Sequence, residues 1–182
     1  MIETHIEFTI TLLNQLTEKA RLKKLIQDFV RYHKLSENAK NDITLVLEEI
    51  FINIIKYVYC SSSKHYVDIS LQEQDKKIFI TVKDEGKVFN IFNTEEIHHP
   101  NFSQDNIKDI SLSAVLIGTL IDAHSYKRKD KTNTLIINMT DSFDKETAVT
   151  RICKNTDLAW PEELSKNNTL NSLEDYKKYL NK

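Results

Sequence analysis

Glycine is scarce in this chain: there are two, Gly86 and Gly118, among 182 residues, where average usage would give about 13. A site that cradles phosphate in a glycine-rich loop must therefore manage with few of its glycines. The two cysteines, Cys60 and Cys153, cannot by themselves make a disulfide framework or a zinc site. The cytosol is accordingly the expected compartment, so the protein is predicted to be cytoplasmic.

No charge of one sign dominates the chain. The 25 basic and 27 acidic residues leave a net charge of −2, which gives no general attraction to nucleic acid or to an anionic membrane. No apolar run approaches the ~20 residues of a membrane span, and the N-terminus does not resemble a secretory signal. With 40% hydrophobic and 29% charged residues, the composition is typical of a soluble globular domain.

The spacing of apolar residues predicts alternating groups of strands and helices. We expect a strand at 6–12, helices at 17–33 and 37–59 with Ser36 as N-cap of the second, strands at 66–71 and 77–83 joined by a loop at 72–76, a polar loop at 90–110, a helix at 114–121 capped from Ser111 or Ser113, and strands at 125–128 and 134–139. This order predicts an α+β fold, a two-layer sandwich with a mixed, mostly antiparallel sheet and helices on one face. Residues 1–140 form the predicted domain, and 141–182, where the composition changes, a mainly helical C-terminal extension.

One stripe on the second predicted helix is polar. Glu49, Asn53 and Lys56 follow each other at spacings of four and three, which places them on one helical face. A carboxylate and a carboxamide on an otherwise apolar helix are costly unless they face solvent or a cavity. A solvated face is the simpler interpretation. The strand that ends in Asp84-x-Gly86-x-x-Phe89 favours a functional site.

These segments resemble a known family. Glu49-x-x-x-Asn53, followed by the segment Val82–Phe89, is similar to the N box and first glycine box of the GHKL ATPases, which include gyrase and the histidine kinases. The closest pattern is that of the anti-sigma factor serine/threonine kinases, whose lid-proximal helix resembles Leu116–Asp122. The resemblance covers about residues 5–140 and implies the GHKL, or Bergerat, fold for this domain.

The resemblance also implies roles for individual residues. Glu49 would act as the base toward an incoming hydroxyl, and Asn53 would bind Mg²⁺. Asp84 would accept a hydrogen bond from the adenine amino group, supported by Thr134, and Gly86 would let the backbone pass close to the base. The residues that the resemblance assigns to binding ATP or ADP are Asn53, Lys56, Asp84, Gly86, Phe89, Ser111, Leu112, Ser113 and Thr134.

The second glycine box departs from the family pattern. Relatives carry Gly-x-Gly before the lid helix, where this chain has Ser111-Leu112-Ser113. The glycines let backbone N–H groups surround phosphate at a helix N-terminus. A residue with a Cβ at positive φ costs about 1–2 kcal/mol, so two such positions would weaken binding by roughly ten- to several-hundred-fold.

Three classes of function follow from these observations. The resemblance implies an ATP-dependent anti-sigma factor, a homodimeric serine/threonine kinase that uses Mg²⁺. It would bind a sigma factor and phosphorylate a STAS-domain antagonist in a partner switch, without contacting nucleic acid or a membrane. The alternative is a degenerate binding module of the same fold with little nucleotide binding. A third class, the ATP-binding domain of a sensor histidine kinase, is disfavoured because the chain starts at the first strand and leaves no room for a dimerisation helix.

Overall fold

A computed structural model describes residues 6–59, 63–93 and 103–141. Within these residues the strands form a five-stranded sheet in the order β1-β2-β3-β5-β4, with every pair antiparallel. The elements are β1 (Phe8–Leu13), the 3₁₀ turn η1 (Leu16–Glu18), α1 (Lys19–His33), α2 (Glu37–Asn53), the π-helical turn η2 (Ile54–Val58), β2 (Tyr66–Gln74), β3 (Lys77–Asp84), α4 (Gln104–Leu120), β4 (Ala123–Lys129) and β5 (Thr132–Thr140). Apart from Asp141, the predicted C-terminal extension lies outside the described residues.

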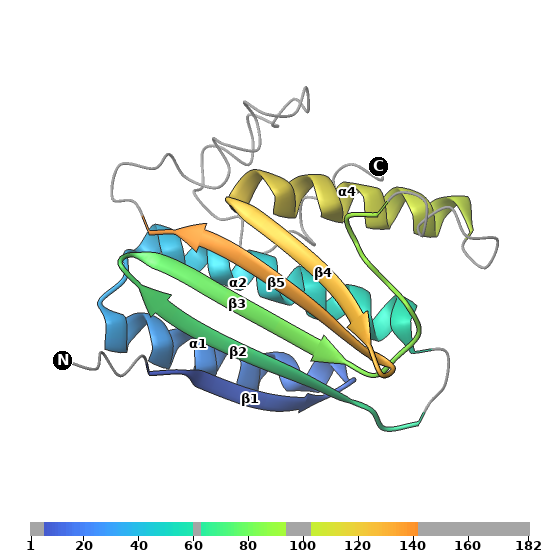
Figure 1. Cartoon of the computed structure of the whole chain (residues 1–182), viewed down its shortest axis with the longest axis horizontal. Helices are drawn as coiled ribbons and strands as arrows, with labels where there is room; N and C mark the ends of the chain where they lie inside the picture. Colours follow the sequence, from blue (N-terminus) through green and yellow to red (C-terminus); the bar gives the residue numbers. More distant parts are fainter. Residues whose placement is uncertain (1–5, 60–62, 94–102, 142–182) are drawn as a thin grey trace.

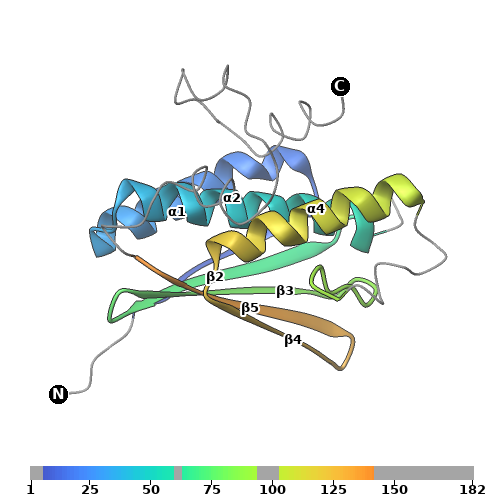
Figure 2. The same cartoon turned by 90° about the horizontal axis from the view of Figure 1, so that it is seen from above.

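The three helices cover one face of the sheet (Figures 1 and 2), which confirms the predicted α+β sandwich. Strand register places alternate side chains toward the helices, since successive residues of a strand point to opposite faces. The fully or almost fully buried residues on this inner face are Leu12, Val67, Ile69, Leu71, Ile78, Ile80, Val82, Ile137 and Met139. They pack with Phe29, Ile43, Leu47 and Phe51 of α1 and α2 into one hydrophobic core. None of the helices in the described ranges is both long enough and apolar enough to cross a lipid bilayer.

Helix α2 begins where the sequence predicts and ends differently. Ser36 is the N-cap: its Oγ accepts a hydrogen bond from the Ala39 backbone N–H at 3.0 Å and donates one to Asp141. The backbone N–H of Ser36 donates to the same carboxylate at 3.1 Å. The last predicted turn is the π-helical η2 rather than α-helix, a feature that often marks functional sites.

Both hairpins turn more tightly than the sequence suggests. β2 and β3 are joined by Asp75 and Lys76 alone, both with positive φ of 53° and 63°, instead of the expected five-residue loop. Asp130 and Lys131 repeat this arrangement between β4 and β5. Two-residue turns with two positive φ angles match the twist of the strands that they join. The expectation was wrong because glycine normally marks such turns, and this chain uses aspartate and lysine.

Helix α4 is longer than predicted, and its start is corrected. It begins at Gln104 rather than near Ser111, and Ser103 is its N-cap. The Ser103 side chain and the Asn106 side chain each bind the other residue's backbone N–H, which forms a capping box. Ile107 and Ile110 extend the apolar face toward this start. Part of the predicted polar loop is therefore helix. The sequence signal for this start is weak, because the capping box has Asn106 where glutamate or glutamine is usual.

Gly118 provides a stability test of this helix. It lies in the exposed interior of α4, and a Cβ added there would have no heavy atom within 4 Å. Because glycine is a poor helix former, Gly118→Ala is expected to raise the free energy of unfolding by about 1 kcal/mol. That gain corresponds to a thermal midpoint higher by about 2–4 °C, measurable by circular dichroism. A lower midpoint would mean that this side of α4 is covered in solution.

Candidate functional site

Four polar side chains of α2 are buried, and two of them, Glu49 and Asn53, contact each other. Glu49 and Asn53 are 4% and 2% exposed. The Asn53 Nδ2 donates hydrogen bonds to the Glu49 Oε1 at 2.9 Å and to the Glu49 backbone oxygen at 2.8 Å. The predicted spacing of four therefore brings the carboxylate and the amide into direct contact. Since a buried carboxylate is costly unless it is hydrogen bonded, this pair requires partners.

Helix α4 supplies one such partner. Ser113 is fully buried, and its Oγ donates a hydrogen bond to the Glu49 Oε1. The same hydroxyl lies 2.8 Å from the Asp109 backbone oxygen one turn earlier. A side-chain hydroxyl thus meets Glu49 at the oxygen that also accepts the Asn53 amide. Glu49 therefore accepts hydrogen bonds from a hydroxyl group and from an amide at one oxygen.

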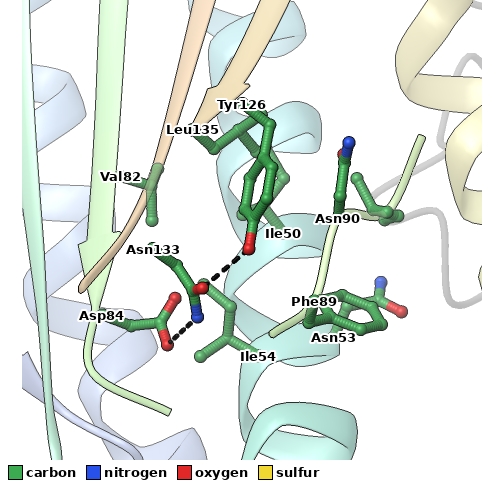
Figure 3. Close-up of a pocket in the computed structure, with 11 residues that line it drawn as sticks. Ile50, Asn53, Ile54, Val82, Asp84, Phe89, Asn90, Tyr126, Asn133 and Leu135 are labelled. Atoms are coloured by element: carbon green, nitrogen blue, oxygen red, sulfur yellow. Dashed lines mark hydrogen bonds between the residues drawn. The ribbon is translucent and has the colours of Figure 1, made fainter. Parts of the chain in front are cut away.

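A pocket lies between α2, the inner face of the sheet and the segment after β3. It is lined by Ile50, Asn53, Ile54, Val82, Asp84, Phe89, Asn90, Ile91, Tyr126, Asn133 and Leu135. Figure 3 shows Asp84 and Asn133 on the side of the strands and Asn53 with Phe89 on the opposite side. Its walls are apolar, and its polar groups come from three separate parts of the chain. A mainly apolar lining with a few convergent polar groups is typical of small-molecule sites.

Asp84 ends β3 at this pocket and is held by two N–H groups. The Asn133 Nδ2 donates to Asp84 Oδ1 at 2.9 Å, and the Gly86 backbone N–H donates to the same oxygen at 2.8 Å. Burial raises the pKa of Asp84 above its usual value, while the hydrogen bonds from Asn133 and Gly86 and the charge of Arg128 act in the opposite direction. Desolvation therefore favours the neutral carboxyl group, and the hydrogen-bond donors favour the carboxylate.

Asn53 and Asp84 are the residues of this pocket that could hold a metal ion and a ligand amino group, respectively. Because the Asn53 Nδ2 faces Glu49, the amide oxygen is turned away from Glu49, and carbonyl and carboxylate oxygens are the ligands that Mg²⁺ prefers. Asp84 offers an acceptor at the other end of the pocket. The cavity volume is about 20 Å³, room for about one water molecule. A cavity of this volume is too small for a purine base, so the pocket must widen before a nucleotide can enter.

Two residues assigned by the resemblance, Thr134 and Lys56, do not line the pocket. Thr134 pairs with Lys83 and is next to Asn133 on β5. Since neighbours on a strand face opposite sides, Thr134 points to the open face of the sheet, and Asn133 takes the place beside Asp84. Lys56 is exposed and does not line the pocket, because the π-helical turn η2 changes the rotation that the spacing argument assumed.

Gly86 was expected to make room for a nucleotide base, and the structure places protein side chains next to it instead. A Cβ added there would lie 2.0 Å from the Val58 Cγ1 and 3.1 Å from the Tyr59 Cε1. The close approach that the structure records is to the C-terminal end of the α2–η2 helix. Gly86 is needed for this packing whether or not a nucleotide is present.

The segment Ser111-Leu112-Ser113 does not form a helix N-terminus. It lies inside α4, which starts at Gln104. Backbone N–H groups within an α-helix donate to the carbonyl four residues earlier, so in this conformation these N–H groups cannot surround a phosphate. The predicted anion site at the start of the lid helix is therefore absent from this segment.

The sequence did not predict three residues at the site. Asn133 and Tyr126 line the pocket, and Arg128 donates a hydrogen bond to Asn133. The alternation of Leu135, Ile137 and Met139 on β5 extends back to Asn133 and was the available signal. The adjacent residues Ile136 and Ile137 hid this alternation, because they place apolar side chains on both faces of the strand.

Comparisons with known proteins give the family. The solved structure of the Acinetobacter baumannii histidine kinase AdeS matches with a TM-score of 0.38 and 15% sequence identity, over 72% of this chain and 68% of that chain. The sequence matches none of the curated proteins with which it was compared. The family model of the histidine kinase-like ATPase domain matches residues 13–139. The match spans well over half of the chain, which therefore belongs to the histidine kinase-like ATPase domain family.

Proposed function

We propose that this protein is an ATP-dependent serine/threonine protein kinase that acts as an anti-sigma factor. The observation that carries the proposal is the buried Glu49–Asn53 pair on α2, with Asn53 lining the same pocket as Asp84. A purely structural helix has no need for a carboxylate and an amide at this spacing in a core. The resemblance of the whole pattern, including Leu116–Asp122, to the anti-sigma factor kinases supplies the specific class.

The chemistry follows from the placement of these groups. Asn53 would hold Mg²⁺, which neutralises charge on the nucleotide phosphates when bound. Glu49 would take the proton from a serine or threonine hydroxyl of a partner. At the same time, the oxygen of that hydroxyl would form a bond to the γ-phosphorus. The bond from that phosphorus to the bridging oxygen breaks, and ADP leaves. Ser113 donates a hydrogen bond to Glu49, so a substrate hydroxyl that reaches Glu49 would have to displace it.

The partners are proposed from the same resemblance. A STAS-domain antagonist would supply the acceptor hydroxyl, a sigma factor would be held in the alternative state, and the protein would act as a homodimer without contacting nucleic acid or a membrane. The near-balanced charge of the chain is compatible with protein partners.

Nucleotide binding is the first test. A ligand at about 100 times its Kd stabilises the folded state by about 2.7 kcal/mol. We therefore expect millimolar Mg-ATP or Mg-ADP to raise the thermal midpoint by about 5–10 °C, as measured by differential scanning fluorimetry. Phosphoserine or phosphothreonine on a co-purified STAS-domain protein, detected by mass spectrometry, completes the test. The absence of any shift at millimolar nucleotide rejects the kinase.

A degenerate binding module is the second candidate. Two observations favour it: the narrow cavity, and the engagement of residues 111–113 within α4. In that case the fold would act through protein surfaces alone. Binding of a STAS-domain protein or a sigma factor without any effect of ATP distinguishes this function from the kinase.

A further inference from the structure

Asn133 stands at the centre of a hydrogen-bond network beside the pocket. Its Nδ2 donates to Asp84 Oδ1 and to the Lys87 backbone oxygen, both at 2.9 Å. Its Oδ1 accepts hydrogen bonds from the Tyr126 hydroxyl at 2.7 Å and from the Arg128 Nη1 at 2.5 Å. The amide thus uses both of its donors and both of its acceptor positions. A side chain only 2% exposed with every hydrogen bond made is firmly oriented.

The orientation of this amide is fixed by its partners. Arginine can only donate, so the Asn133 oxygen must face Arg128 and the nitrogen must face Asp84. Arg128 also donates to the Gly86 backbone oxygen at 2.9 Å, which ties the segment after β3 to the same network. The dashed contacts in Figure 3 join Tyr126 to Asn133 and Asn133 to Asp84.

The network decides which oxygen of Asp84 is offered to a ligand. Oδ1 accepts the N–H groups of Asn133 and Gly86. No hydrogen bond from residues 6–59, 63–93 or 103–141 to Oδ2 is recorded, so Oδ2 is the acceptor that remains at the pocket. Because burial raises the pKa of Asp84 and the Asn133 hydrogen bond counteracts it, Asn133 also favours the charged, acceptor-only carboxylate.

We propose that Asn133 is a positioning residue that sets base specificity by holding Asp84 as an ionised acceptor, which selects a base with an exocyclic amino group at that edge. This inference rests on the proposed nucleotide-binding function. Adenine presents such an amino group, whereas guanine presents an oxygen there. With guanine, the base oxygen would face the Asp84 carboxylate, and both acceptors would be buried without a hydrogen bond. Sites that recognise a ligand by a buried hydrogen bond discriminate strongly against ligands that cannot form it.

The test compares Mg-ATP with Mg-GTP. Dissociation constants from calorimetry are expected to favour ATP by at least about 100-fold in the wild type. In Asn133→Leu, which keeps the size and removes the amide, the ratio is expected to fall at least about tenfold, the value of one polar contact. Ile136→Val, on the open face of the same strand, is the matched control and should keep the wild-type ratio.

A second variant covers the case in which Asn133→Leu does not fold. Tyr126→Phe removes only the hydroxyl that donates to Asn133 Oδ1 and is expected to lower the ratio about threefold or more. A folded Asn133→Leu with the wild-type ratio overturns the role of Asn133 and leaves the kinase proposal standing; if only Tyr126→Phe folds, its unchanged ratio does the same. Failure of the wild type to bind either nucleotide overturns both proposals.

Discussion

A Glu49→Gln variant is expected to bind Mg-ATP nearly as well as the wild type and to lose phosphoryl transfer by about 10²–10⁴-fold. Glutamine keeps the size and can still accept the Asn53 amide hydrogen bond, but it cannot take a proton from the incoming hydroxyl. The loss should therefore appear in kcat rather than in nucleotide affinity. Initial rates of phosphorylation of a STAS-domain protein, together with a calorimetric Kd for ATP, measure the two effects separately.

Glu48 gives a matched control on the same helix. It is also buried, but it forms ion pairs with Lys19 at 2.9 Å and Lys23 at 3.1 Å on α1. Glu48→Gln is expected to lower stability, because it weakens a partly buried pair, and to leave the transfer rate within about threefold of the wild type. Equal transfer rates for wild type and Glu49→Gln would remove Glu49 from the role of base.

Gly86→Ala is expected to destabilise the domain by about 1–3 kcal/mol. The added methyl group would lie 2.0 Å from the Val58 Cγ1 and 3.0 Å from the Asp84 Oδ1, so either η2 or the segment after β3 must shift. Val58 is almost fully buried, so its side chain cannot turn into solvent. The expected fall in the thermal midpoint is about 3–10 °C, measured by circular dichroism without nucleotide.

A double-mutant cycle identifies the cause of this loss. Val58→Ala alone should cost about 2 kcal/mol by leaving a cavity. If the contact with Val58 is the origin of the strain, the pair Gly86→Ala and Val58→Ala should lose at least about 1 kcal/mol less than the sum of the single losses. Strict additivity would place the strain elsewhere, at Tyr59 or in the Asp84 hydrogen bond.

The sequence predicts the part of the candidate site on α2 better than the rest of the site. Glu49 and Asn53 are four residues apart on an α-helix, and their contact needs only local geometry. Asp84 at the end of a strand is likewise a local feature. Asn133, Tyr126 and Arg128 reach Asp84 only through the pairing of β3, β5 and β4, which spacing along the chain does not reveal.

The amino-acid sequence by itself determined the α+β order of elements, the Ser36 cap, the Glu49–Asn53 spacing and the family pattern, because these depend on periodicity and short-range contacts. Only the tertiary structure decided that Asn133 rather than Thr134 faces Asp84, that Ser113 lies inside α4 against Glu49, and that Gly86 packs on Val58. Strand register and the approach of helices are set by the packing of the whole core, and a shift of one residue reverses which side chain faces the pocket.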